Sequence, residues 1–145
     1  MDHVAIMDKK KKLLEKIVSG EKTIESRWYV NRISPWNKIK KGDMVWFKNS
    51  GERVTLKAKV SKVLQFDSLT PSKILKILKT YGKEIGFRKD KHNNWAENSS
   101  NKHYCILAFL SSPKLVKPFE INKDGFGLST AWISIGNINS IRKQT

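Results

Sequence analysis

The sequence between residues 20 and 27 reads Gly20-Glu21-Lys22-Thr23-Ile24-Glu25-Ser26-Arg27, and it carries the strongest indication of the fold. An apolar stripe at spacings of three and four precedes it and predicts a helix that ends at Gly20. The octet then starts a strand, in which Glu25 and Arg27 project from one face. Trp28 and Tyr29 follow directly. Fixed charges beside planar apolar surface are typical of a binding site.

Further short strands are expected on both sides of the octet. Apolar runs and alternating patterns, bounded by turn residues, predict strands over residues 4–7, 44–47, 54–61, 104–110 and 132–135. The alternation over 54–61 is the clearest strand pattern in the chain. Pro113 and Pro118 are expected to bracket a stiff connection after residue 110.

Two helices are expected among these strands. Asp8 is suited to cap the first, and Thr70-Pro71 has the order of an N-cap and a first helical residue, with Gly82 predicted to end that second helix. The polar segment from Phe87 to Lys102 is expected to be a long loop or a poorly ordered insertion.

Short strands outnumber helices, which favours an α+β fold. A doubly wound parallel sheet would need a helix in every crossover. We therefore predict a compact mixed β-barrel of about six strands with two or three helices, formed by a single domain over residues 1–145.

The chain is strongly basic, with 29 lysine and arginine residues against 13 acidic ones and a net charge of +16. Such an excess attracts polyanions, so nucleic acid is the expected partner; the alternative is that the lysines only solvate the surface. Cys105 lies in an apolar run and is expected to be a buried core residue, and a lone cysteine suits a reducing compartment. We expect a cytoplasmic protein without a membrane-spanning segment.

Neither a metal nor a cofactor is expected. The histidines His3, His92 and His103 have no metal-ligand spacing. The sequence also has no Gly-x-Ser-x-Gly motif and no glycine-rich phosphate loop. The sequence does not indicate an oligomeric state.

The pattern Gly-x-Lys-x-x-Glu-x-Arg, formed by Gly20, Lys22, Glu25 and Arg27, resembles the signature of the ASCH domain family in the PUA-like superfamily. The strand and helix before it, the turn over Lys40 to Asp43 and the alternating strand after it extend the resemblance to about Phe66. The resemblance implies a PUA-like β-barrel with a cleft lined by the motif, and a role in binding or processing RNA. PUA-like relatives also include readers of modified bases.

Some ASCH proteins resemble small amidohydrolases that act on acetylated cytidine, with a threonine nucleophile three residues after the lysine. That position is Glu25 in this chain, and Thr23 stands at another offset. The amidohydrolase mechanism therefore does not transfer cleanly.

The residues leave several interpretations open. For a binding module, Lys22 and Arg27 would hold phosphate or a base edge, Glu25 would orient Arg27, and stacking platforms are offered by Trp28, Tyr29, Trp36, Trp95 and Trp132. For a small hydrolase, a ribonuclease or an amidohydrolase on a modified nucleoside, the candidates are Lys22, Glu25 and Arg27. Two further alternatives are a structural Glu25 to Arg27 ion pair and a protein-interaction module with an incidental basic surface.

Overall fold

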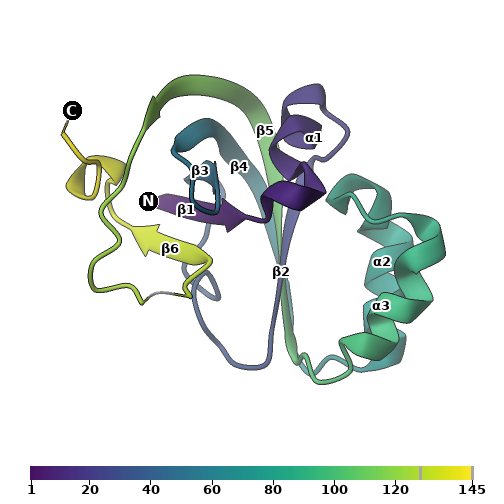
Figure 1. The fold of residues 1–145 in the computed structure, drawn as a ribbon. Coiled ribbons are helices and arrows are strands. Elements are labelled where there is room, and N and C mark those ends of the chain that lie inside the picture. Colours follow the sequence, from purple (N-terminus) through teal and green to yellow (C-terminus); the bar gives the residue numbers. More distant parts are fainter. Residues whose placement is uncertain (128, 145) are drawn as a thin grey trace.

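The computed structural model describes residues 1–127 and 129–144. Within them, six strands form one mixed sheet that curls into a half-barrel (Figure 1). The strands are β1 (Asp2–Met7), β2 (Ile24–Tyr29), β3 (Met44–Asn49), β4 (Val54–Phe66), β5 (Tyr104–Phe119) and β6 (Trp132–Ile135). Their order in the sheet is β2-β5-β4-β3-β1-β6; β1 and β3 run parallel, and the other neighbours are antiparallel. The predicted α+β mixed barrel is confirmed.

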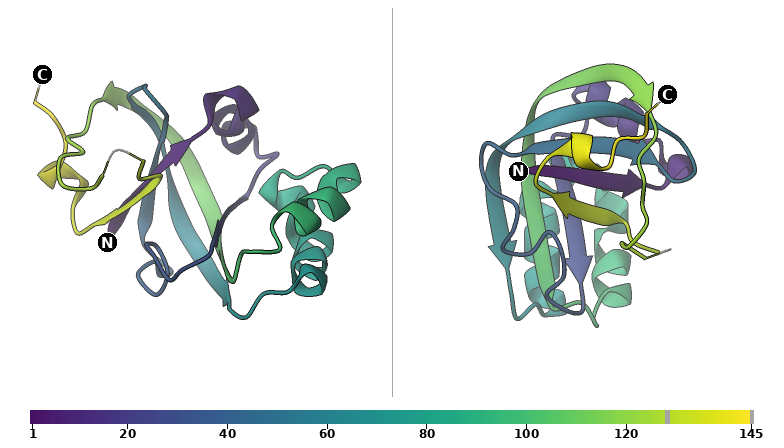
Figure 2. Two further views of the ribbon diagram at one scale, coloured as in Figure 1. Left: turned by 60° about the horizontal axis from the view of Figure 1, so that its bottom comes forward. Right: turned by 90° about the vertical axis from the view of Figure 1, so that its left-hand side faces the viewer.

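Three α-helices accompany this sheet in the described residues: α1 (Leu13–Ser19), α2 (Pro71–Ile85) and α3 (His92–Asn98). Short 3₁₀ turns occupy Lys9–Lys11, Lys89–Lys91 and Ile138–Ser140. Two views in Figure 2 show α2 and α3 together on one side of the sheet, with α1 beside the start of β2. None of these helices has the length and apolar content required to cross a bilayer.

The first helical segment is broken where one continuous helix was predicted. Asp8 caps only the 3₁₀ turn, through its side chain and the Lys10 N–H, and Lys12 then adopts a left-handed conformation with φ of 53°. The α-helix therefore begins only at Leu13. It ends before Gly20, as predicted, and Gly20 has a φ of 83°.

The two faces of β2 and β5 pack against different cores. On one face Ile24, Cys105 and Leu107 pack against α2 and α3. On the other face Ile106 and Ala108 join a core with the central strands and α1. Cys105 is fully buried, as predicted. Because β2 pairs only with β5 in the sheet, its other edge is free of strands.

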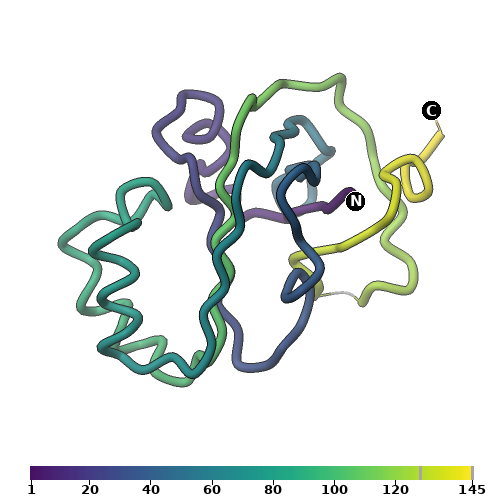
Figure 3. The backbone as a smooth tube through the Cα atoms, turned by 180° about the vertical axis from the view of Figure 1, so that it is seen from behind, coloured from purple at the N-terminus to yellow at the C-terminus, as the bar shows by residue number. Residues whose placement is uncertain are grey.

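The prediction that β5 stops at residue 110 is wrong. The strand continues through Pro113 and Pro118 to Phe119, and Figure 3 shows it running alongside β4. The pairing register shifts between Lys57 and Lys59, opposite a bulge where Ser112 has a φ of 51°. A proline has no N–H to donate, and an irregular ladder tolerates that loss.

Two predictions about residues 82–102 are also wrong. Helix α2 passes through Gly82 and ends at Gly86, which has a φ of 99°. The segment from 87 to 102 contains a 3₁₀ turn and α3 where a loop was expected. Gly82 is needed inside the helix because the His92 ring packs on it: a Cβ at residue 82 would lie 2.6 Å from His92 Nε2.

Candidate functional site

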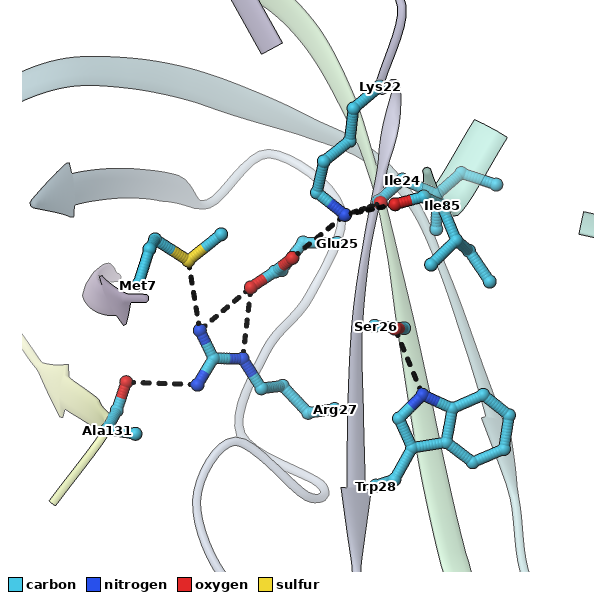
Figure 4. A network of polar contacts seen from close by, with 9 residues as sticks. All are labelled: Met7, Lys22, Ile24, Glu25, Ser26, Arg27, Trp28, Ile85 and Ala131. Carbon is cyan, nitrogen blue, oxygen red and sulfur yellow. Dashed lines mark hydrogen bonds and ion pairs between the residues drawn. The ribbon is translucent and has the colours of Figure 1, made fainter. Parts of the chain in front are cut away.

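Lys22, Glu25 and Arg27 meet at the start of β2, on the side of the sheet that faces β1 and β6 (Figure 4). Glu25 and Arg27 share a face of the strand, as the alternation predicted, and lie opposite Ala108 and Ile106 of β5. Lys22 precedes the strand, in the turn after α1. The three charges therefore form one cluster at an edge strand of the sheet.

The ammonium group of Lys22 is buried and fully engaged by the protein. Its Nζ donates hydrogen bonds to the carbonyl oxygens of Ile24 at 2.7 Å and Ile85 at 2.6 Å. It lies 3.1 Å from Glu25 Oε1, and the Lys22 side chain is 2% exposed. A lysine ammonium has three protons to donate, and all three have acceptors here. Lys22 thus has no remaining donor for a ligand.

Arg27 holds the other oxygen of the same carboxylate. Its Nε and NH2 groups donate to Glu25 Oε2 at 3.1 and 2.8 Å. NH2 also contacts Met7 Sδ at 3.3 Å, and NH1 donates to the Ala131 carbonyl at 3.1 Å. With five N–H donors on the guanidinium, one NH1 proton remains for another acceptor.

Two cations keep Glu25 ionised. Burial raises the pKa of this carboxyl, but Lys22 and Arg27 together outweigh burial and hold the pKa below its usual range. The triad then has two positive charges and one negative charge. A carboxylate with a lowered pKa is a poor proton acceptor at neutral pH, so Glu25 is suited to fix its two neighbours.

The triad lies in the wall of a cleft of about 700 Å³ beside the free edge of β2. Basic side chains outnumber acidic ones among its described lining residues. The seven cations are Lys11, Lys16, Lys22, Arg27, Arg88, Lys91 and Lys102, and the two carboxylates are Asp8 and Glu25. The size is in the range of small-ligand sites, and the excess of five positive charges favours an anion.

Three aromatic rings form one side of this cleft. Trp28 meets Trp95 edge to face, with ring centroids 4.6 Å apart, and Phe87 lies 5.2 Å from Trp95. The Trp28 indole N–H donates to Ser26 Oγ at 3.0 Å, which fixes the ring on the strand. Trp95 is half-buried on α3 and closes the group from outside the sheet. Flat apolar surface therefore adjoins the basic rim.

The free edge of β2 adds backbone groups to the cleft. The carbonyls of Thr23 and Tyr29 accept hydrogen bonds from Leu110 and His103, on the β5 side. Alternate residues of an antiparallel strand direct their backbone groups to opposite edges, so those of Ser26 and Trp28 point away from β5. These N–H and C=O groups are suited to hydrogen-bond a base edge.

Tyr29 lines the same cleft, and burial raises the pKa of its phenol against the opposite effect of Arg27. Two other predicted stacking residues lie elsewhere. Trp36 packs edge to face on Tyr104, with centroids 4.9 Å apart. Trp132 is buried, and its ring lies 5.1 Å from the Arg27 guanidinium carbon. Trp132 therefore packs against Arg27 and has no exposed ring face on which a base could stack.

Trp132 also belongs to a network of hydrogen-bonded side chains. Its indole N–H donates to His3 Nδ1 at 3.2 Å, and the Ser134 hydroxyl lies 2.9 Å from the same nitrogen. Because Nδ1 accepts a hydrogen bond, a neutral ring carries its proton on Nε2, which donates to Asp43 Oδ2 at 2.8 Å. Burial lowers the pKa of His3 against the opposite effect of Asp43, in agreement with this neutral ring.

The cleft also contains residues that the sequence did not single out. Phe87, Arg88, Lys91 and Lys102 belong to the segment that was expected to be a loop. The only feature of the sequence that could have indicated them is the basic and aromatic composition around Trp95. Thr23, the threonine that follows Lys22, is exposed and lies outside the cleft lining. Among residues 1–127 and 129–144, histidine, cysteine and carboxylate side chains form no group of three that would hold a metal ion.

Solved structures place this architecture among the ASCH domain folds. The ASCH protein from Zymomonas mobilis superposes with a TM-score of 0.66 at 17% identity, over 99% of this chain and 96% of that one. A tyrosine-to-phenylalanine variant of that protein gives 0.67 at 16% identity, over 96% and 93%. A hypothetical protein named PH0355 gives 0.54 at 18% identity, over 80% and 100%.

This chain therefore has the fold of ASCH domain proteins, as the resemblance of the octet implied. At these identities the likeness concerns the fold alone. Comparisons with protein-family models and with curated proteins gave no match.

Proposed function

We propose that this domain binds RNA or a nucleotide in the cleft beside β2. The observation that carries the proposal is the juxtaposition, in one cleft of about 700 Å³, of an aromatic group with seven basic side chains. Bases stack on aromatic rings, and phosphates attract lysine and arginine. A protein-interaction surface would not need both in one hollow.

The residue roles that we propose differ from those expected from the sequence. Lys22 is saturated by its protein partners, and Arg27 retains one donor. We assign the phosphate contacts to cations at the rim of the cleft, principally the exposed Lys11 and Lys91 and the half-buried Lys102. The triad contributes net positive charge to the cleft wall, and the backbone of Ser26 and Trp28 contacts the base.

Fluorescence anisotropy with a labelled single-stranded U10 RNA tests this proposal. A variant with Lys11→Ala, Lys91→Ala and Lys102→Ala should bind at least about tenfold more weakly, and its salt slope should fall by roughly 2, since each phosphate contact adds about 0.7. The matched control removes three exposed lysines outside the cleft, Lys59→Ala, Lys114→Ala and Lys117→Ala.

Equal losses in the two triple variants would show that net charge alone attracts the RNA, and they would overturn the assigned cleft. The absence of binding to both U10 and UMP at about 100 mM salt would overturn the proposed function itself. In that case the interaction module becomes the better explanation of the basic surface.

A further inference from the structure

A second hollow adjoins the first one across a short stretch of backbone. It measures about 920 Å³ and lies between the end of α1 and the facing turns of α2 and α3. The two hollows share four lining residues, Lys16, Gly86, Phe87 and Arg88. Lys16 comes from α1, and the other three come from the segment that directly follows α2.

Gly86 lies where the two hollows meet. Gly86 caps α2 with a φ of 99°, which strongly favours glycine, and it presents no side chain where the two hollows meet. The aliphatic chain of Lys22 lies against it, 3.9 Å from the position that a Cβ would take. A ligand can therefore approach the backbone closely at Gly86.

The two hollows differ in chemistry. The second one is lined by five cations, Lys16, Lys79, Lys83, Arg88 and Lys89, and by one carboxylate, Glu21. Phe87 is its only aromatic carbocycle among the described lining residues, and it is shared with the first hollow, which also contains Trp28, Tyr29 and Trp95. The second hollow thus offers positive charge without a stacking wall.

Two of these cations repeat along one side of α2. Lys79 and Lys83 are four residues apart, so they project from the same face, one turn apart. Both are exposed, and neither has an acidic partner among the ion pairs of the described residues. Their pairing with successive phosphates of a flexible strand requires no rearrangement of the helix.

We propose that one RNA strand passes through both hollows, with a base in the first and the phosphates of neighbouring nucleotides in the second. The site then recognises an oligonucleotide in preference to a free nucleotide. This inference rests on the proposed function and deepens it, because it names the length and the path of the ligand.

The test compares UMP, U3, U6 and U10 as competitors of a labelled U10 RNA. The unmodified protein should bind U6 at least about tenfold more tightly than UMP, since the strand adds phosphate contacts at Lys79, Lys83 and Lys89. A variant with Lys79→Ala, Lys83→Ala and Lys89→Ala should lose most of this gain and keep its affinity for UMP. The control with Lys59→Ala, Lys114→Ala and Lys117→Ala should keep the gain.

Failure of this inference differs from failure of the proposed function. If UMP binds and the Lys11, Lys91 and Lys102 variant weakens it, but longer RNA gains nothing, the first hollow is the whole site and the strand path is wrong. A length gain that persists in the Lys79, Lys83 and Lys89 variant also overturns the path. Circular dichroism and thermal unfolding confirm that each variant is folded.

Discussion

The Lys22 ammonium donates a hydrogen bond of 2.6 Å to the carbonyl oxygen of Ile85, the last residue of α2. Through the same group it contacts Ile24 and Glu25 at the start of β2. One buried lysine therefore joins the C-terminal end of a helix, where carbonyl oxygens lack helical partners, to the strand that carries the triad. Lys22 thus stabilises the packing of α2 against the strand that lines the cleft.

Replacement of Lys22 should unfold the domain more readily. In Lys22→Met, two backbone carbonyls and a buried carboxylate lose their donor, and we expect the free energy of unfolding to fall by roughly 3–5 kcal/mol. Urea denaturation followed by circular dichroism measures this loss. The double variant Lys22→Met with Glu25→Gln should recover part of it, because a neutral amide replaces a buried carboxylate that has kept only Arg27 as a partner. A loss below about 1 kcal/mol in the single variant would contradict the assigned role.

Glu25 should make stability depend on acid. Its pKa is lower in the folded protein than in the unfolded chain, so the unfolded chain takes up the proton first. The contribution of Glu25 is present above roughly pH 4.3 and is lost as the pH falls below that value through the folded pKa. The free energy of unfolding, measured by urea denaturation between pH 6 and pH 3, should fall less steeply in Glu25→Gln. Parallel profiles would show that the triad is not ionised as described.

His3 should make stability depend on pH in a higher range than Glu25 does. Burial lowers its pKa in the folded protein, so the unfolded chain binds the proton first, and stability falls as the pH drops below roughly 6.5. We expect Tm to decline between pH 7 and pH 5.5, and to decline less in His3→Gln. The exposed His103→Gln is the matched control. An unchanged slope in His3→Gln would rule out His3 as the titrating group.

A methyl group at Gly82 should separate α2 from α3. Alanine normally favours a helix over glycine by about 1 kcal/mol, but here its Cβ would lie 2.6 Å from His92 Nε2. We expect Gly82→Ala to lower the free energy of unfolding by roughly 1–3 kcal/mol. A cycle with His92→Ala tests the cause, since Gly82→Ala should be neutral or stabilising in that background. Stabilisation by Gly82→Ala alone would contradict the packing.

The tryptophans of the chain should differ sharply in RNA binding. Trp95→Ala removes an aromatic face of the cleft and should weaken U10 binding by on the order of 1–3 kcal/mol, whereas Trp95→Phe should retain most of the affinity. Trp36 packs on Tyr104 outside the cleft lining, so Trp36→Ala should leave binding nearly unchanged once folding is verified. Similar losses in Trp95→Ala and Trp36→Ala would count against the cleft as the binding site.

The sequence by itself determined the fold class and the place of the charged cluster. Local patterns sufficed there: alternation over 54–61 defined β4, Gly20 ended α1, and strand parity placed Glu25 and Arg27 on one face. These features depend on residues that are close together in the chain, so local sequence patterns are enough to predict them.

Only the tertiary structure decided what the cluster does with its charges. Lys22 looked like a free phosphate ligand until Ile85, 63 residues later, proved to be its acceptor. The helical segment over residues 89–98 escaped prediction because its polar residues show no apolar period. With its flanking residues it supplies Phe87, Arg88, Lys91, Trp95 and Lys102 to the cleft. Hydrogen-bond saturation and cleft composition arise from contacts between distant segments, and spacing along the chain does not encode them.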